Sequence, residues 1–281
     1  MEWSEIGDWP LADISRQITG PVHRWHVQEM GDGPLVLLLH GAGGSCHSFR
    51  GLIPTIAADF KVVAVDLPGH GFTKLGARQR SSLPAMAQDI YALCKQQGWQ
   101  PSALIGHSAG AAVALQMARV LRQRVIGLNA ALGEFPGLAG LVFPLMAKSL
   151  AMMPFATTLF SGAAASPQRI QTLIASTGST LDTEGYALYR RLVGDKTHVD
   201  GTLQMMAQWN LRGLLDSLPT YEGPVDLIVG AQDKTVPPKV SRDTAARMQN
   251  ATVHVLDGLG HLAHEEAPQK VATLIRNLLA K

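Results

Sequence analysis

Five residues near the middle of the chain have the types and spacing of a serine nucleophile. Residues 106–110 read G-x-S-x-G, with Ser108 at the centre. A short apolar stretch, 101–105, precedes them, and an alanine-rich helical pattern, 111–120, follows. Strand, sharp turn and helix is the context in which this motif forms a nucleophile elbow. The sequence therefore predicts that Ser108 lies at a helix N-terminus, where free N–H groups favour a developing negative charge.

A nucleophilic serine needs a base to accept its proton and a third group to orient that base. Asp233 follows the apolar run 227–230, and His261 follows another strand pattern, 252–256. Both would therefore leave the C-terminal ends of strands, where one edge of a parallel sheet can gather them. We expect His261 to accept the Ser108 proton and return it to the leaving group. Asp233 would fix the imidazole tautomer and stabilise its cation.

Stabilising a tetrahedral oxyanion requires two N–H donors aimed at one point. Ala109, the residue after the serine, is positioned to supply one donor. Three glycines in 40–44 follow the buried strand pattern 35–39, which indicates a loop whose backbone approaches something closely. We expect Ala42 in this loop to supply the second donor, with Gly43 as its neighbour. Each such donor typically stabilises the transition state by about 3 kcal/mol.

Several other polar residues compete for these roles. His264 is an alternative base, although it is better placed to open the last helix, and Glu134 is an alternative acid. His107 within the motif is expected to face away from the serine and to pack. Other acidic and imidazole side chains are interpreted as structural or as loop-ordering residues: His40, His70, Asp226, His254 and Asp257.

Apolar strand patterns alternate with helical patterns over most of the chain. This alternation is typical of a mostly parallel sheet that is flanked by helices and joined by right-handed crossovers. Residues 1–20 are expected to be irregular. The expected strands are 22–30, 35–39, 61–66, 101–105, 124–129, 224–230 and 252–256, and the expected helices are 49–58, 84–97, 111–120, 239–248 and 267–279.

The alternation stops between residue 133 and about residue 221, where only helical and loop patterns occur. We interpret 133–221 as a helical cap inserted after the strand at 124–129, which counts as the sixth strand of the fold. Residues 1–132 and 222–281 would form the core. The C-terminal edge of the sheet, where open α/β folds bind ligands, would lie beneath the cap.

The first part of this cap, 135–160, is strongly apolar, and Lys148 is its single charged residue. Three prolines interrupt it, which favours short helices over a membrane span. We expect a lid that grips a lipophilic ligand, with peripheral membrane contact as a further hypothesis. Met205, Met206 and Trp209 add adaptable apolar surface, or form the core of the lid itself.

Bulk properties exclude several classes of function. The 281 residues carry a formal net charge of +2 without a basic cluster, which gives nucleic-acid binding no support. The two cysteines, Cys46 and Cys94, predict no disulfide framework, and the acidic first residues predict no signal peptide, so we expect a cytoplasmic protein. Neither a phosphate-binding fingerprint nor a cluster with metal-ligand spacing occurs, so we expect no cofactor and no metal.

Five motifs carry a resemblance to the α/β-hydrolase superfamily: HGAGG at 40–44, DLPGHG at 66–71, GHSAG at 106–110, GAQD at 230–233 and GLGH at 258–261. Their order, serine then acid then histidine, is the order of that fold. Five longer stretches resemble the BchO-type magnesium-chelatase accessory proteins of bacteriochlorophyll biosynthesis, and those in the cap weigh most because caps differ between hydrolase subfamilies. They are HRWHVQEMGDGPLVLLLHGAGGSCHSFRGLIP, IGHSAGAAVALQMA, GLNAALGEFPGLAG, TGSTLDTEGYALYRRLV and MMAQWNL. This resemblance implies a role near magnesium insertion into a porphyrin, and it transfers the triad to Ser108, Asp233 and His261.

Two hypotheses of different classes follow. The first is a serine esterase that acts on a lipophilic ester, with a tetrapyrrole ester as the motivated substrate. The second is a non-catalytic accessory protein that binds a porphyrin or magnesium-chelatase subunits on a hydrolase scaffold, because a fold does not dictate a function. A complete triad favours the first hypothesis, since a scaffold has no need of it.

Overall fold

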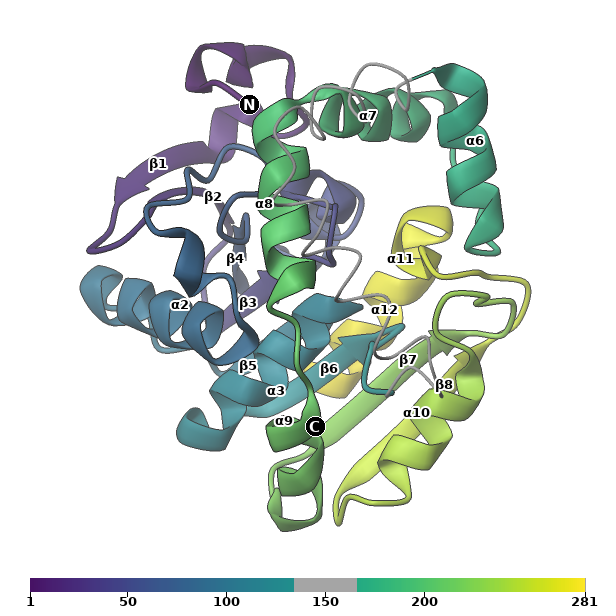
Figure 1. Cartoon of the computed structure of the whole chain (residues 1–281). Helices are drawn as coiled ribbons and strands as arrows, with labels where there is room; N and C mark the ends of the chain where they lie inside the picture. The colour runs from purple at the N-terminus through teal and green to yellow at the C-terminus, as the bar shows by residue number, and fades with distance from the viewer. Residues whose placement is uncertain (134–165, 281) are drawn as a thin grey trace.

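A computed structural model describes residues 1–133 and 166–280 of the chain. Within these residues one twisted sheet forms the centre of the molecule, in the order β1-β2-β4-β3-β5-β6-β7-β8 (Figure 1). β1 and β2 pair antiparallel, as do β2 and β4, and every other neighbouring pair is parallel. The strands are β1 (Ser15–Thr19), β2 (Arg24–Met30), β3 (Leu35–Leu39), β4 (Lys61–Val65), β5 (Ala103–His107), β6 (Arg124–Leu128), β7 (Val225–Gly230) and β8 (Ala251–Leu256).

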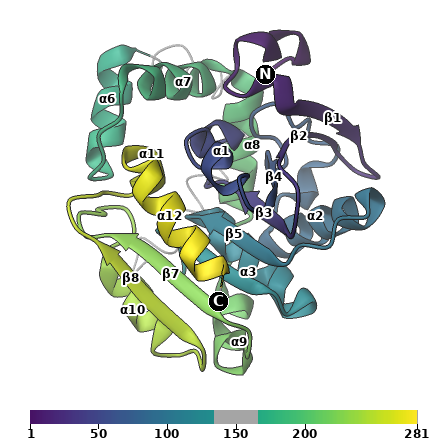
Figure 2. The same ribbon diagram turned by 180° about the vertical axis from the view of Figure 1, so that it is seen from behind.

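Helices cover both faces of the sheet. α2, α3, α9 and α10 lie on one face, and α1 and α12 lie on the other, which Figure 2 shows from behind. The helices are α1 (Ile53–Ile56), α2 (Leu83–Gln97), α3 (Ala109–Leu121), α6 (Pro167–Ser176), α7 (Thr183–Gly194), α8 (Lys196–Ala207), α9 (Arg212–Ser217), α10 (Pro238–Ala245), α11 (Ala263–Glu266) and α12 (Pro268–Leu279).

The central strands are buried on both faces, as their continuous apolar sequences predict. All five residues of β3 and all five of β5 are buried. The alternate side chains Leu37 and Leu39 enter one core cluster, whereas Val36 and Leu38 enter the other. This two-sided burial fixes the strand register and hence the positions of the loops at the C-terminal ends of the strands.

The structure confirms the predicted mostly parallel sheet with flanking helices and corrects the beginning of the chain. Residues 1–20 are not irregular, because they contain two short 3-10 helices and the edge strand β1. The mixed sequence Ser15–Thr19 lacks the alternation of a half-buried strand, and of these five residues only Ile18 is buried. Backbone pairing with β2, rather than side-chain burial, therefore makes this segment a strand.

Helices α6, α7 and α8 lie beyond the C-terminal ends of the central strands, as Figure 1 shows. Apolar side chains of α6 and α7 share a cluster with the N-terminal residues: Met1 and Trp9 are grouped there with Phe72, Leu188 and Leu192. In contrast, Met205 of α8 and the leucines of α9 belong to the core cluster on the face of the sheet that α2 and α3 cover. The predicted division at 133–221 remains a prediction, and its apolar part, 135–160, lies outside the described residues. None of the described helices combines the length and apolarity of a membrane span.

Candidate active site

Ser108 occupies a sharp turn between β5 and α3. Its backbone has φ 50° and ψ −116°, a conformation that costs a non-glycine residue about 1–3 kcal/mol. Three backbone bonds hold it there: its N–H donates to Leu128 O at 2.9 Å, and its carbonyl accepts from the N–H groups of Ala111 and Ala131, each at 3.1 Å. Leu128 and Ala131 lie at the end of β6 and just after it, and β6 pairs in parallel with β5. The side chain is half-buried at the first turn of α3.

Glycines allow the end of β5, the start of α3 and the loop after β3 to approach one another closely at this turn. A Cβ on Gly106 would collide with the backbone of Gly110 and Ala111, and a Cβ on Gly110 would collide with the carbonyl of Leu39. A Cβ on Gly41 would lie 2.8 Å from His107 Nδ1 and 3.1 Å from Ser108 Cβ. The glycine-rich loop after β3 therefore packs directly against the serine, as the sequence predicted.

The acid and base candidates are brought together in the structure. His261 Nδ1 lies 2.8 Å from Asp233 Oδ2, and both residues are buried. Asp233 Oδ1 accepts the backbone N–H groups of Thr235 and Val236, each at 2.8 Å. Because an ionised carboxylate only accepts hydrogen bonds, His261 Nδ1 carries the hydrogen and Nε2 has the free lone pair. This tautomer is the one that a general base requires.

Asn129 is a further site residue that the sequence analysis missed. Its Nδ2 donates to Asp233 Oδ2 at 2.7 Å and to Gly260 O at 3.1 Å, so one amide holds the acid loop and the histidine loop together. The residue is fully buried and has φ 48°, which asparagine tolerates better than most residues. Its position directly after the buried strand β6, at the same sheet edge as Asp233, was the available signal.

A segment between α6 and α7 also braces these two loops. The carbonyl of Thr177 accepts the N–H of Lys234 at 3.1 Å and that of His261 at 3.4 Å. The hydroxyl of Ser179 accepts the N–H of Leu262 at 2.8 Å and donates to Glu266 Oε1 at 2.8 Å. Sequence spacing gave no signal for these contacts, because they join residues more than 50 positions apart.

His107 connects the serine turn to the histidine loop. Its Nε2–H donates to the carbonyl of His261 at 3.0 Å, and the two rings lie 4.9 Å apart. It also packs against His264, with ring centroids 4.4 Å apart. Burial lowers the pKa values of both His107 and His264, the latter to about 3. His264 lies in the short helix α11 rather than at the start of α12, and Glu134 lies outside the described residues.

The proposed oxyanion loop is a tight turn. Gly44 N–H donates to Gly41 O at 3.0 Å, and Gly43 has φ +73°, as the third position of a type II turn requires. His40 fixes this turn: its Nε2 accepts the N–H of Leu67 at 2.8 Å, so its Nδ1–H donates to Gly41 O, also at 2.8 Å. Fixing a carbonyl fixes the N–H on the other side of the same planar peptide, which here is the N–H of Ala42.

The two N–H groups predicted to bind the oxyanion belong to Ala42 and Ala109. No acceptor in residues 1–133 or 166–280 receives the N–H of Ala42 or of Ala109. Ala109 is the first residue of α3, where N–H groups have no partner within the helix. The arrangement therefore offers two N–H donors on segments that meet at Ser108.

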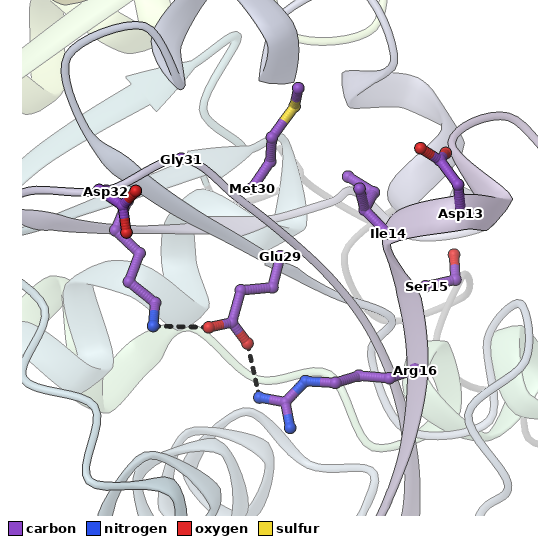
Figure 3. A pocket seen from close by; sticks show the side chains of 9 residues that line it. Asp13, Ile14, Ser15, Arg16, Glu29, Met30, Gly31 and Asp32 are labelled. Carbon is purple, nitrogen blue, oxygen red and sulfur yellow. Dashed lines mark hydrogen bonds and ion pairs between the residues drawn. The ribbon is translucent and has the colours of Figure 1, made fainter.

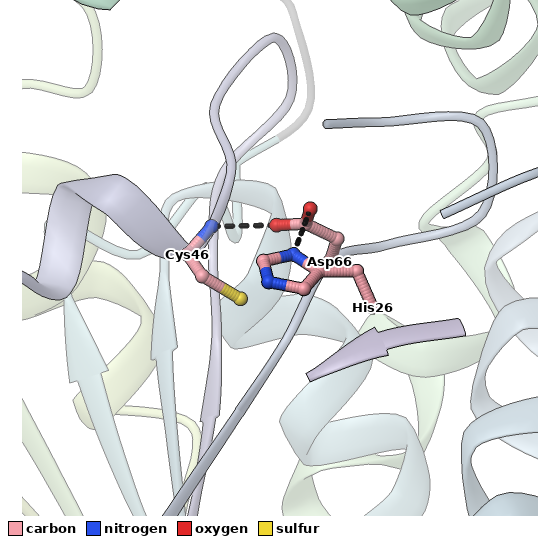
Figure 4. Close-up of side chains that lie close together, drawn as sticks. All are labelled: His26, Cys46 and Asp66. Atoms are coloured by element: carbon pink, nitrogen blue, oxygen red, sulfur yellow. Dashed lines mark hydrogen bonds and ion pairs between the residues drawn. The ribbon is translucent and has the colours of Figure 1, made fainter. Parts of the chain in front are cut away.

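A second serine–histidine–aspartate set lies at the antiparallel edge of the sheet. Ser15 Oγ lies 3.1 Å from His26 Nε2, and His26 Nδ1 lies 2.6 Å from Asp66 Oδ2. With Cys46, the residues His26 and Asp66 form a buried group whose ligand atoms lie within 4.8 Å of one another (Figure 4). Asp66 already accepts from His26 and from the N–H groups of Cys46 and Phe72, so we interpret the group as structural rather than metal-binding.

A shallow hollow of about 480 Å³ lies beside this edge and is drawn in Figure 3. Its central carboxylate, Glu29, is paired with Arg16 at 2.5 Å and with Lys61 at 2.6 Å. These surface ion pairs leave no buried polar group to orient a ligand. None of the residues that line the hollow belongs to the candidate site at Ser108.

Comparison with known proteins agrees with this architecture. The family model for the alpha/beta hydrolase fold matches residues 34–268. The magnesium-chelatase 30 kDa subunit of Rhodobacter capsulatus is 46% identical over 275 residues, which cover 97% of this chain and 96% of that protein. A pimeloyl-[acyl-carrier protein] methyl ester esterase of Methylococcus capsulatus is 28% identical, with 90% and 98% covered.

Among solved structures, the epoxide hydrolase CorEH matches 95% of this chain and 98% of its own, with a TM-score of 0.78 and 24% sequence identity. At this identity the likeness concerns the fold alone. The chain belongs to the α/β-hydrolase family, and within that family it groups with the magnesium-chelatase 30 kDa subunit.

Proposed function

We propose that this protein is a serine hydrolase of the carboxylic-ester type, with Ser108 as nucleophile, His261 as base and Asp233 as its orienting acid. The observation that carries the proposal is the strained turn at Ser108, which begins a helix and packs against the glycine-rich loop. Strain of this kind persists only where the surroundings impose it, and it concentrates at functional sites. Two free N–H groups, those of Ala42 and Ala109, complete the proposed site.

In the proposed reaction, Ser108 Oγ attacks the ester carbonyl carbon while its proton passes to His261 Nε2. The carbonyl oxygen becomes an oxyanion, which accepts the Ala42 and Ala109 N–H groups. The bond to the alcohol oxygen then breaks, and His261 protonates the departing alcohol. Water repeats the sequence on the acyl-serine and releases the acid, with Asp233 stabilising the imidazolium in each half.

A lipophilic ester is the proposed substrate class, and an ester of a tetrapyrrole is its most specific form. Two relatives support this: one is named a methyl ester esterase, and the other is a magnesium-chelatase subunit. The apolar sequence of 135–160, which lies outside the described residues, favours an apolar ligand and peripheral contact with a membrane from the cytoplasmic side.

Labelling with a fluorophosphonate probe tests the proposed nucleophile. The probe phosphonylates an activated serine, so we expect the wild-type protein to be labelled and the Ser108→Ala variant to be unlabelled. Circular dichroism of both proteins serves as the folding control. A folded wild-type protein that does not react with the probe would contradict the hydrolase proposal.

The 46% identity to a magnesium-chelatase subunit favours a second candidate function. In this alternative the protein binds a porphyrin or chelatase subunits without using Ser108. We would measure protoporphyrin binding by fluorescence quenching, and chelatase-subunit binding by co-purification, for wild type and Ser108→Ala. Binding that is equal in both proteins, without any ester turnover, would favour this function over the first.

A further inference from the structure

His198 on α8 joins this helix to two loops at the proposed site. Its Nε2 lies 3.2 Å from the carbonyl oxygen of Gly43, and its Nδ1 lies 3.0 Å from the backbone N of Gly71. The side chain is 2% exposed. Gly43 belongs to the turn that contains Ala42, and Gly71 belongs to the loop after β4. One imidazole therefore uses both of its ring nitrogens on backbone groups of the core.

The backbone partners determine the tautomer of His198. The N–H of Gly71 can only donate, so Nδ1 must be the accepting nitrogen. Nε2 then carries the hydrogen and donates it to Gly43 O. Burial lowers the pKa of His198 to about 4, which keeps the ring neutral at pH 7. Neutrality is required because a proton on Nδ1 would break the bond to Gly71.

The bond from His198 continues through two peptide groups. Gly43 O and Gly44 N–H belong to one planar peptide, and that N–H donates to Gly41 O at 3.0 Å. Gly41 O in turn shares a peptide with Ala42 N–H, the donor proposed for the oxyanion. Hydrogen bonds arranged in a chain polarise one another, by roughly 10–30% per bond. A donor on Gly43 O thus adds to the bond from His40 that already holds Gly41 O, and it strengthens the Ala42 N–H as a donor.

The approach of α8 that allows this contact depends on a glycine pair. A Cβ on Gly201, one turn after His198, would collide with the backbone of Gly69. Gly43 itself is less crowded: among the described residues, a Cβ there would have only the methyl group of Thr202 within 4 Å. Packing around its Cα therefore does little to orient the Gly43 peptide, whereas the imidazole of His198 does.

We propose that His198 is a positioning residue for the oxyanion hole. A hydrogen-bonded chain runs from its imidazole through the Gly43–Gly44 peptide to the Gly41–Ala42 peptide, which carries the proposed oxyanion donor. The inference rests on the proposed function, because it assumes that Ala42 N–H binds the oxyanion. Through His198, the helix α8 of the predicted cap would then affect the rate of the chemical step as well as access to the site.

Two substitutions separate the two bonds of the imidazole. In His198→Gln, the amide nitrogen reaches the place of Nε2 and keeps the bond to Gly43 O. In His198→Asn, the amide oxygen takes the place of Nδ1 and keeps the bond to Gly71 N–H, whereas the donor to Gly43 is lost. The two variants therefore differ in the one contact that the proposal invokes.

Hydrolysis of p-nitrophenyl butyrate is the kinetic test. We expect His198→Asn to lower kcat about tenfold with KM changed less than about twofold, since an oxyanion bond acts on the transition state. We expect His198→Gln to keep kcat within about threefold of wild type. A role confined to anchoring α8 would instead affect both variants alike, or would raise KM, and either result would overturn the proposal. Melting temperatures control for folding.

The chemical shift of the Gly44 amide proton, measured by NMR on ¹⁵N-labelled protein, tests the hydrogen-bonded chain independently of enzyme activity. We expect this resonance to move upfield in His198→Asn and to stay near its wild-type position in His198→Gln. Equal shifts in both variants would overturn the hydrogen-bonded chain. If the wild-type protein shows no turnover that depends on Ser108, the proposed function fails. The Gly44 amide shift then still decides whether the hydrogen-bonded chain from His198 exists.

Discussion

Among the residues that the structure describes, two serine–histidine–aspartate sets can be compared, and we propose that the one at Ser108 is catalytic. In the set at the sheet edge, Ser15 Oγ lies 3.1 Å from His26 Nε2, and His26 Nδ1 lies 2.6 Å from Asp66. In the set at the proposed site, His261 Nδ1 lies 2.8 Å from Asp233. The residue types and the histidine–aspartate distances are thus nearly the same.

The surroundings of the two serines differ. The Ser15 hydroxyl donates to Leu11 O and accepts from Gln28 Nε2, each at 3.1 Å, so its hydrogen is already used by a carbonyl. Ser15 lies in the ordinary extended backbone of an edge strand. Ser108 lies in a strained turn at the start of α3, beside the N–H groups of Ala42 and Ala109, which have no acceptor among the described residues. The backbone around the serine, rather than the side-chain set, is therefore what distinguishes the proposed nucleophile from the hydroxyl of Ser15.

Removing each serine is the strongest way to test this difference. Ser108→Ala deletes the attacking oxygen, and we expect kcat for p-nitrophenyl butyrate to fall about 10⁶-fold, the loss typical of a deleted triad serine. Ser15→Ala removes a hydroxyl that is bonded only to structural groups, so we expect kcat within about twofold of wild type. Stopped-time assays of both variants measure kcat relative to the wild-type protein. Equal losses in both would remove the distinction between the sets.

Removing each carboxylate should separate the two sets by activity. Asp233→Asn favours the wrong tautomer of His261, and we expect kcat to fall about 10⁴-fold. We also expect a lower melting temperature, because the buried carboxylate accepts from Asn129 and from two backbone N–H groups. Asp66→Asn weakens a buried group that holds His26 and two backbone N–H groups, and we expect a loss of about 3 kcal/mol in the free energy of unfolding.

Urea unfolding and steady-state kinetics on the same preparations provide the comparison for the two carboxylates. If Asp233→Asn kept near-normal turnover, another acid would have to orient His261. If Asp66→Asn left the unfolding free energy unchanged, the edge set would not be the structural unit described above.

The buried histidines predict a smaller effect, a decrease in the free energy of unfolding at acid pH. Burial lowers the pKa values of His47, His70, His107, His198 and His264 below the ordinary value of 6.5. As the pH falls from about 6.5 to about 4, the unfolded chain therefore binds protons that the folded chain does not. Linkage then requires the free energy of unfolding to fall as the pH falls over this range.

Urea unfolding at several pH values measures this slope, and one histidine offers a matched variant. His264 packs against Phe49 and His107, and neither of its nitrogens has a hydrogen-bond partner among the described residues. His264→Leu removes one titrating group without removing a hydrogen bond, so we expect a shallower loss of stability in acid. An equal slope in the variant and in wild type would contradict the assignment of His264 as a neutral buried ring.

The parts of the site that the sequence predicted are the local ones. The nucleophile turn follows from a motif of five residues between a strand and a helix. Asp233 and His261 follow from the rule that parallel strands end at one edge. The strand pattern also predicted the buried core strands, because their apolar runs admit few alternatives.

The parts that the sequence did not predict depend on contacts between distant residues. Asn129 and Thr177 act through bonds to loops about 100 and 60–80 residues later in the chain, and no local pattern marks them. His198 reaches Gly43 across 155 positions. The strand β1 was missed because its backbone pairing, and not its side-chain pattern, makes it a strand. Such features become visible only when the fold brings the segments together.

The central claim, that Ser108 alone is the activated serine, is tested most directly by locating the phosphonate adduct. The protein is treated with a fluorophosphonate, digested, and analysed by tandem mass spectrometry. We predict one adduct per chain, on the peptide that contains residues 106–110, and an unmodified Ser15. An adduct on Ser15 or another serine, or a folded protein without any adduct, would contradict the account.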